Sequence, residues 1–397
     1  MMQLDVSTAF LNGKIDKDVY VQIPLTFETN KTKGKCYKLK KALYGLKQAG
    51  CLWHAALDEQ LQAFGFKRCR AELCIYMHGT SDAMILLAIY IDDLLVIGAT
   101  ALRVQAVRQQ LSSVFSITDQ GNISHIIRLS VQYDRKARTL SIDQNGYIDG
   151  VLTKFGMSEA WTAPTPATET INSLSPWEAN IASAEEVRHY VSLVGSLLWI
   201  AQGSRPDIAF AVGCCAQFVA NPSREHLAAA KRILRYLKGT MRINLSAREP
   251  IGKLILTGWA DSNWAGSRNC RKLTSGYIFA IDGLICSWLS RLQLTVANSS
   301  VEAEYVALAG AARELIWTMM FLSELRQSAP TTTGIQVSAG MSIIHSHDRR
   351  LSFDWNVPVL YSDSSGACAI ASNPQHFKRT KHIDIAHFFL WDKVASQ

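Results

Sequence analysis

The chain has 397 residues, of which 48% are hydrophobic and 19% charged, so it can form two or three domains with sizeable buried cores. Lysine and arginine number 41 against 33 acidic residues, and the formal net charge of +8 favours polyanionic partners such as nucleic acid. The nine cysteines contain no C-x-x-C pair and no Cys/His array with zinc spacing, which excludes that type of zinc module and indicates reduced thiols inside a cell.

The first part of the chain alternates strand-like and helical segments. Its apolar periodicity and turn residues predict strands at 19–23 and 84–97 and helices at 47–64 and 103–115. The most apolar run is too short to span a bilayer and contains Asp92 and Asp93, so we expect no membrane span.

The middle of the chain is expected to be helical and the last third a mixed α/β domain. A loop rich in Pro, Ser and Thr marks the first boundary near residue 161. Helices are predicted at 185–219, 224–238 and 300–326, and loop at 327–356. From residue 251 three short strands precede the long helix, and a further strand and helix follow, which favours helices packed on a sheet. The expected domains are 1–160, 161–250 and 251–397.

Two adjacent carboxylates, Asp92 and Asp93, lie between apolar runs in AMILLAIY-IDD-LLVIG. Like charges this close repel, and a divalent cation such as Mg²⁺ would neutralise them. Asp5 in QLDVSTAFLNG ends another short strand-like run, and a third carboxylate would complete a two-metal site for phosphoryl transfer. The alternatives are a solvated Asp-Asp turn for the pair and a helix N-cap for Asp5.

Four ordered motifs then indicate a family. QLDVSTAFLNG, VYVQIP, KLKKALYGLKQA and YIDDLLVIG together resemble the reverse transcriptase of copia-type retrotransposons. The resemblance implies that Asp5, Asp92 and Asp93 are the metal-binding carboxylates of a polymerase palm, and that Gln48 lies near the incoming nucleotide and template. In the lysine-rich segment 31–41 we expect Lys38, Lys40 and Lys41 to contact phosphates, which would make binding salt-dependent. The alternative for the lysines is a solvated loop.

A second set of acids lies in the last third. Asp261 in LTGWADSNWAG and Asp363 in VLYSDSSGA each come at the end of a strand-like run, so they can converge at one sheet edge. Ser299 and Glu302 have the spacing of a capping box, which gives Glu302 a structural role. Glu304 shares a helix face with apolar residues, and a carboxylate on a buried stripe must be paired or bind a metal. We therefore prefer Glu304 to Glu302 as the third acid.

These segments resemble a ribonuclease H domain of the copia type. The motifs are WADSNWAG, SGYIFAIDG, SWLSRLQLTVANSSVEAEYVAL, YSDSSGACAIASNP and RTKHIDIAHFF, in family order. The resemblance implies metal-bound Asp261, Glu304 and Asp363, with Asp384 as a fourth catalytic acid, and two Mg²⁺ or Mn²⁺ ions in each active site. It implies hydrolysis of the RNA strand of an RNA–DNA hybrid, read through backbone shape and 2′-hydroxyls.

The resemblance covers almost the whole chain, because YVSLVGSLLWIAQGSRPDIAFAV and PSREHLAAAKRILRYLKGT match the connecting region. It implies an α/β (α+β) architecture of an incomplete polymerase palm and thumb or connection, followed by a ribonuclease H-like mixed sheet with flanking helices. The implied partners are RNA template, DNA primer, RNA–DNA hybrid and deoxynucleoside triphosphates, in a cytoplasmic particle or the nucleus, without a membrane. Asp207 in SRPDIAF is expected to be a structural acid.

Three departures from the family pattern bear on activity. The chain begins four residues before Asp5, so the upstream finger region, whose cations hold the triphosphate, is not in this sequence. Arg128 stands at a turn position where the family has glycine, Gly50-Cys51 replace the usual Pro-Arg, and 331–357 resembles an insertion. We expect these changes to inactivate DNA synthesis and to leave hybrid cleavage; the alternative is a catalytically silent nucleic-acid-binding remnant.

Overall fold

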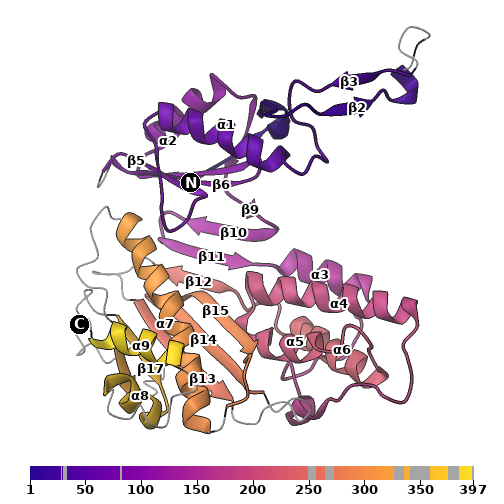
Figure 1. Cartoon of the computed structure of the whole chain (residues 1–397), viewed down its shortest axis with the longest axis vertical. Coiled ribbons are helices and arrows are strands. Elements are labelled where there is room, and N and C mark those ends of the chain that lie inside the picture. Colours follow the sequence, from indigo (N-terminus) through magenta and orange to yellow (C-terminus); the bar gives the residue numbers. More distant parts are fainter. Residues whose placement is uncertain are drawn as a thin grey trace. The chain divides into compact units, whose positions relative to one another are not determined.

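The computed structural model describes residues 1–27, 29, 34–80, 83–248, 256–263, 272–297, 299–325, 335–339, 358–373 and 384–395, with backbone only at 25, 384–388 and 391. Figure 1 labels the elements in chain order. The chain forms two compact units, one of Met1–Ile123 with Met320–Ala329 and the other of Ser124–Met319 with Pro330–Gln397. Each unit is described separately.

The first unit is built on an antiparallel sheet with the strand order β4-β5-β6-β7-β1-β8. The strands are β1 (Met2–Val6), β4 (Lys67–Arg68), β5 (Ile75–His78), β6 (Ile85–Tyr90), β7 (Asp93–Gly98) and β8 (Ile117–Asn122). Helices α1 (Ala49–Ala63) and α2 (Ala101–Ser112) share one core with this sheet. A separate ribbon pairs β2 (Tyr20–Gln22) with β3 (Cys36–Lys38).

Alternation of buried and less buried side chains along the strands explains why the sheet has one buried face. In β6 the side chains of Ile85, Leu87 and Ile89 are buried and their neighbours are not, as a period of two requires. The predicted strand 84–97 is a hairpin, because β6 and β7 are separated by a two-residue turn at Ile91 and Asp92. The predicted helices 47–64 and 103–115 are confirmed as α1 and α2.

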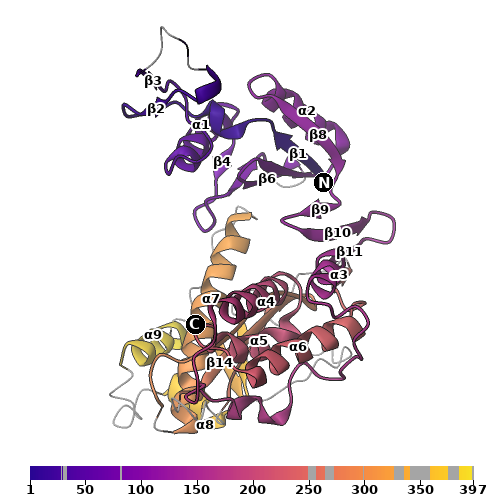
Figure 2. The same ribbon diagram turned by 90° about the vertical axis from the view of Figure 1, so that its right-hand side faces the viewer.

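The second unit begins with a four-stranded sheet and a helical core. Its sheet has the order β12-β11-β10-β9, from β9 (His125–Ile126), β10 (Leu129–Asp134), β11 (Thr139–Asp143) and β12 (Leu245–Arg248). The helices are α3 (Asn145–Lys154), α4 (Ala184–Gly203), α5 (Ala209–Ala216) and α6 (Arg224–Gly239). They bury one apolar cluster, and α4, α5 and α6 lie together in both ribbon views (Figures 1 and 2).

The prediction of one helix over 185–219 is wrong, because the helix is interrupted between α4 and α5. Pro206 has no backbone N–H for a helical hydrogen bond. The Arg205 side chain, only 1% exposed, forms an ion pair of 2.7 Å with Asp207 and donates to the Thr240 carbonyl. Asp207 therefore has the structural role that its sequence context predicts.

The turn between β9 and β10 carries strain. Ile127 and Arg128 have φ values of 50° and 59°, the left-handed region that both central residues of a type I′ turn require. Asn-Gly is favoured in such a turn, whereas Ile127 and Arg128 are sterically strained in this backbone conformation. The arginine at the family's glycine position therefore lies where a glycine would be favoured.

A five-stranded mixed sheet completes the second unit. Its order is β15-β14-β13-β17-β16, antiparallel from β15 to β13 and parallel from β13 to β16. The strands are β13 (Leu256–Asn263), β14 (Thr274–Ile281), β15 (Leu284–Leu292), β16 (Gln336–Ala339) and β17 (Val359–Ser362). Helices α7 (Ser300–Leu325), α8 (Ser365–Ser372) and α9 (Asp384–Ala395) share a core with it, which confirms the predicted α/β fold class.

Helix α7 is the central packing element of this core. Leu308, Ala311 and Leu315 are fully buried on the stripe that the sequence predicted. Of the described helices, α7 is the one whose length and apolar composition would suffice to cross a bilayer, and Leu308, Ala311 and Leu315 of this helix pack in the protein core. Gly258 is required where the Phe279 ring crosses β13, because a Cβ there would lie 2.3 Å from the ring.

The prediction of loop throughout 327–356 is wrong at one place. Gln336–Ala339 form β16, which pairs in parallel with β17 at the edge of the sheet. Residues 331–334 and 340–357, which make up most of the segment 331–357 interpreted as an insertion, lie outside the described residues.

Candidate metal centre

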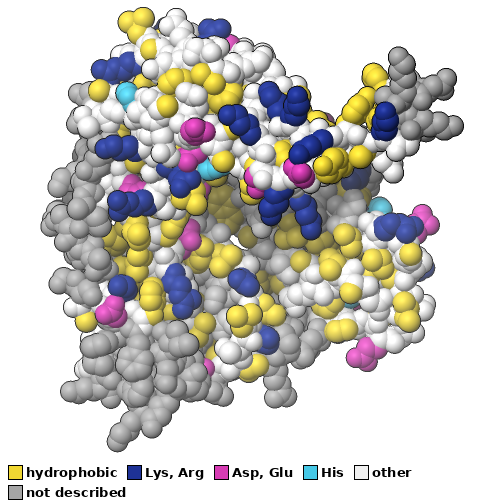
Figure 3. Space-filling model, turned by 45° about the horizontal axis from the view of Figure 1, so that its top comes forward, with side chains coloured by type: hydrophobic (Ala, Val, Ile, Leu, Met, Phe, Trp, Pro, Cys, Tyr) yellow, Lys and Arg dark blue, Asp and Glu magenta, His cyan; other side chains and the backbone are white. Residues whose placement is uncertain are grey.

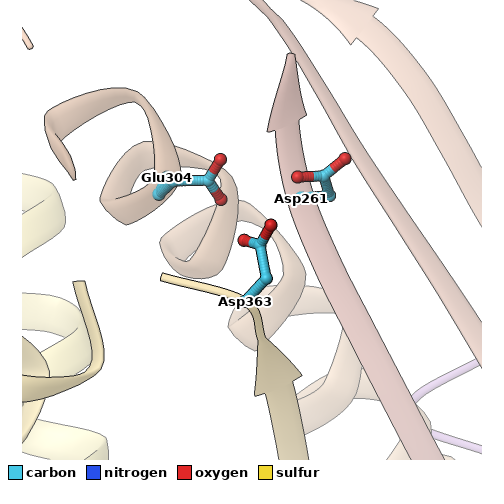
Figure 4. A group of neighbouring side chains, drawn as sticks. All are labelled: Asp261, Glu304 and Asp363. Atoms are coloured by element: carbon cyan, nitrogen blue, oxygen red, sulfur yellow. The ribbon is translucent and has the colours of Figure 1, made fainter. Parts of the chain in front are cut away.

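Three carboxylates gather at one edge of the mixed sheet. Asp261 lies near the end of β13, Asp363 directly follows β17, and Glu304 lies in the first turns of α7. One ligand oxygen from each lies within 4.8 Å of the others. Figure 4 shows the three side chains pointing toward one another. β13 and β17 are parallel neighbours, so their carboxyl ends meet at the same edge, where α7 brings the third acid.

Glu304 is the buried member of this acidic cluster. Its side chain is 8% exposed, whereas Asp261 and Asp363 are exposed. Burial, then the charges of Asp261 and Asp363, raise the pKa of Glu304 to about 7. The backbone N–H of Ser262 donates to its Oε1 at 3.2 Å, which opposes this shift. Its Oε2 is buried and has no hydrogen-bond partner among the residues that the structure describes.

The donor set suits a hard divalent cation. Mg²⁺ prefers oxygen ligands, and a buried carboxylate oxygen without a donor is unfavourable unless a cation or proton neutralises it. The unpartnered Oε2 of Glu304 therefore fits a cation at this position. Glu302 is also buried, and its backbone N–H donates to Ser299 Oγ at 3.2 Å, as one half of the predicted capping box requires. Glu302 does not belong to the cluster.

The three acids of the first unit are neighbours at a strand end. Asp5 in β1 is the register partner of Asp93 in β7, and directly opposed residues have Cα atoms roughly 4.5–5.5 Å apart. The Val6 N–H donates to the Asp92 carbonyl at 2.9 Å. Burial raises the pKa of Asp5, and the charges of Asp92 and Asp93 add to the shift. In the described part of the chain, however, only Asp261, Glu304 and Asp363 bring three ligand atoms within 4.8 Å.

The turn that carries Asp92 is strained and anchored. Ile91 has a φ of 57°, which is unfavourable for a β-branched residue. The Trp53 indole N–H donates to the Ile91 carbonyl at 2.7 Å, and its ring packs edge-on against Phe115 with centroids 5.2 Å apart. Helical periodicity places Trp53 on a packing face, but it does not indicate this hydrogen bond.

Comparison of the sequence with known proteins identifies a matching family and several relatives. A family described as reverse transcriptase (RNA-dependent DNA polymerase) matches residues 1–169. The retrovirus-related Pol polyprotein from transposon TNT 1-94 of Nicotiana tabacum is 33% identical over 100% of this chain and 28% of its own length. The retrovirus-related Pol polyprotein from transposon RE1 of Arabidopsis thaliana is 32% identical over 99% of this chain and 25% of its own length. A putative transposon Ty5-1 protein of Saccharomyces cerevisiae is 31% identical over 79% of this chain and its full length.

The chain belongs to the copia-type retrotransposon Pol family. It spans about a quarter of the length of the two plant Pol polyproteins that it matches. The residues matched by the reverse transcriptase family, 1–169, include Asp5, Asp92 and Asp93.

The remaining predicted residues of this Pol segment lie on the surface of the first unit or outside the described side chains. Lys38 in β3 forms an exposed ion pair of 2.7 Å with Asp18, while Lys40 and Lys41 are exposed. Gln48 precedes α1 and is half-buried. The Asp384 backbone begins α9, but its side chain is not among those described. The functional roles of these residues stay predictions.

Proposed function

We propose that the mixed-sheet part of this Pol segment is a ribonuclease H that cleaves the RNA strand of an RNA–DNA hybrid with two Mg²⁺ or Mn²⁺ ions in its active site. The convergence of Asp261, Glu304 and Asp363 within 4.8 Å carries the proposal, because Glu304 is buried beside two further carboxylates and its Oε2 has no hydrogen-bond partner among the described residues. We assign 1–160 to the polymerase palm and thumb, 161–250 to the connection and 251–397 to the nuclease.

The exposed and the buried acids of the cluster would have different roles in catalysis. Asp261, Glu304 and Asp363 would hold the cations, with Asp384 as the fourth acid. When bound, divalent cations activate the attacking oxygen and stabilise the leaving oxygen of an in-line displacement. Asp261 and Asp363 are exposed and so open to a polyanionic substrate, while the Ser262 N–H fixes the orientation of the Glu304 carboxylate. Burial and the two neighbouring carboxylates raise the pKa of Glu304 to about 7, so a bound cation would compete with a proton for this carboxylate.

Charge on the protein surface favours the same class of substrate. The net charge is +8, with 41 lysine and arginine residues against 33 acidic ones, and Figure 3 shows lysine and arginine side chains on the described surface. Such a surface attracts phosphate backbones without reading base sequence, and affinity falls with salt. Hybrid geometry and 2′-hydroxyls would then select the RNA strand.

A hybrid-cleavage assay on the full chain tests the nuclease. The wild type should cleave the RNA strand of a labelled RNA–DNA hybrid with Mg²⁺ or Mn²⁺ and not in EDTA. Asp261→Asn should lower the rate by more than about 100-fold, because cation stabilisation contributes several kcal/mol. Asp92→Asn makes the same charge change in the first unit and should leave cleavage unchanged.

Equal RNA cleavage by wild type and Asp261→Asn would contradict the proposal. Hybrid binding without any cleavage by the wild type would support the second candidate, a catalytically silent nucleic-acid-binding remnant. The basic surface is the observation that this candidate shares with the nuclease.

For the polymerase site, built on Asp5, Asp92 and Asp93, we propose negligible DNA synthesis. Two observations support this: these acids do not gather as closely as the nuclease acids, and Arg128 strains a turn where the family has glycine. Primer extension that Asp92→Asn abolishes would refute it.

A further inference from the structure

One buried amide connects the elements that carry the nuclease acids. Gln293 follows β15 and its side chain is 6% exposed. Its Nε2 donates to Ser275 Oγ on β14 at 2.8 Å and to the Ala303 carbonyl on α7 at 3.0 Å, and lies 3.5 Å from Ser262 Oγ on β13. Its backbone N–H donates to the Leu273 carbonyl at 2.7 Å, which fixes the start of the side chain.

The partners of Gln293 are the chain neighbours of the acids. Ser262 directly follows Asp261, and Ala303 directly precedes Glu304. The Ser262 N–H in turn donates to Glu304 Oε1, so a closed set of contacts joins Gln293, β13 and α7. A change in the Gln293 side chain would therefore alter the spacing between the backbones that hold the two carboxylates.

Two buried acceptors at this place have no donor within the described part of the chain. They are Gln293 Oε1 and Glu304 Oε2. The amide orientation is determined chemically, because only the nitrogen can donate to the Ala303 carbonyl. A glutamine with an unsatisfied buried oxygen is a poor choice for packing alone, since an apolar side chain of the same length would avoid that loss.

We propose that Gln293 is a positioning residue for the cation site, which sets the separation of Asp261 and Glu304 by holding β13, β14 and α7 together. The inference rests on the proposed nuclease function for its chemistry. Metal ligands depend on the groups that orient them, and loss of such a group typically lowers metal affinity or activity by about 10–100-fold. Gln293 does not touch the substrate or the ions in this assignment.

Gln293→Met is the direct test, because methionine keeps the length and apolar volume and removes all three amide contacts. Gln144→Met is the matched control: Gln144 is 2% exposed and accepts a hydrogen bond from Ser204, but its contacts lie in the helical core of the second unit. Ser275→Ala is the milder variant, because it removes only one acceptor of the Gln293 amide. It serves as the test if Gln293→Met fails to fold.

Mn²⁺ binding to the full chain is measured by electron paramagnetic resonance of the free ion, as the part of the binding that Asp261→Asn removes, and hybrid cleavage is titrated in parallel. Gln293→Met should raise the half-saturating Mn²⁺ concentration by about 10–100-fold, and Ser275→Ala should raise it by less. Gln144→Met should lower the metal-free melting temperature and leave the Mn²⁺ midpoint unchanged. A merely structural role of Gln293 would produce this second pattern.

The outcomes separate the two proposals. An unchanged Mn²⁺ midpoint in Gln293→Met and in Ser275→Ala overturns the positioning role, whatever the cleavage result. If Mn²⁺ binds and Asp261→Asn abolishes binding, but the wild type cleaves no hybrid, the nuclease proposal fails and the midpoints still decide the role of Gln293. If Mn²⁺ binding does not depend on Asp261, there is no ion to position and both proposals fall.

Discussion

Replacing Glu304 by glutamine should stabilise the metal-free protein at pH 8 much more than at pH 5. Burial and two neighbouring carboxylates raise the pKa of Glu304 from 4.5 to about 7, so the folded state binds a proton that the unfolded state has lost. Between pH 4.5 and about pH 7 the free energy of unfolding of the wild type therefore falls as pH rises. At pH 5 Glu304 is protonated in the folded chain, and at pH 8 it must be charged there.

The size of the effect follows from the two pKa values. One pKa unit corresponds to about 1.4 kcal/mol, so the advantage of the glutamine variant should grow by roughly 2–3 kcal/mol from pH 5 to pH 8. The glutamine Oε1 can still accept from the Ser262 N–H, so this contact is not lost. Mn²⁺ should reverse the order, because the ion stabilises only the carboxylate form.

Amide hydrogen exchange is the suitable assay, because a chain with two compact units need not unfold in one step. Exchange of β13 amides is compared between wild type and Glu304→Gln in EDTA at each pH. The variant should gain about 30–100-fold in protection at pH 8 relative to its gain at pH 5. Equal protection of the two proteins at pH 8 would refute the electrostatic account of the site.

Three further predictions concern other parts of the chain. Trp53→Phe removes the donor to the Ile91 carbonyl and should cost about 1 kcal/mol in urea unfolding; an unchanged midpoint would mean that the bond does not hold the turn. Changing Ile127-Arg128 to Asn-Gly should add about 1 kcal/mol, because the turn needs positive φ; a loss of stability would contradict this. Burial lowers the pKa of His226, whose Nδ1 accepts from the Ser223 N–H. Wild type should therefore lose stability as pH falls below 6.5, more than His226→Gln does; parallel melting curves at pH 5.5 and 7.5 would exclude this.

The positions of Asp261, Glu304 and Asp363 could be predicted because each had a local signal. Asp261 and Asp363 end strand-like runs, and Glu304 interrupts an apolar helix stripe, and the structure brings these three together. The acids of the first unit were also expected near one another, and Asp5 faces Asp93 in the sheet.

The features that the sequence did not indicate depend on contacts between distant segments. β16 is a four-residue edge strand of weak strand propensity, and its existence depends on parallel pairing with β17. The break between α4 and α5 is fixed by Arg205 bonding to Asp207 and Thr240. The contacts of Trp53 and Gln293 are single hydrogen bonds across the fold, which leave no periodic trace in the sequence.

The parallel pairing of β13 with β17 also fixes when the acidic cluster can exist during synthesis. Asp261 is translated long before Asp363, and the strand that presents Asp363 comes after α7. Domains tend to form from the N-terminus as the chain leaves the ribosome. A nascent chain can thus complete the sheet of its first unit, which ends at Asn122, before any of the three carboxylates has been synthesised. A message that ends before β17 encodes a protein that lacks the third acid of the cluster.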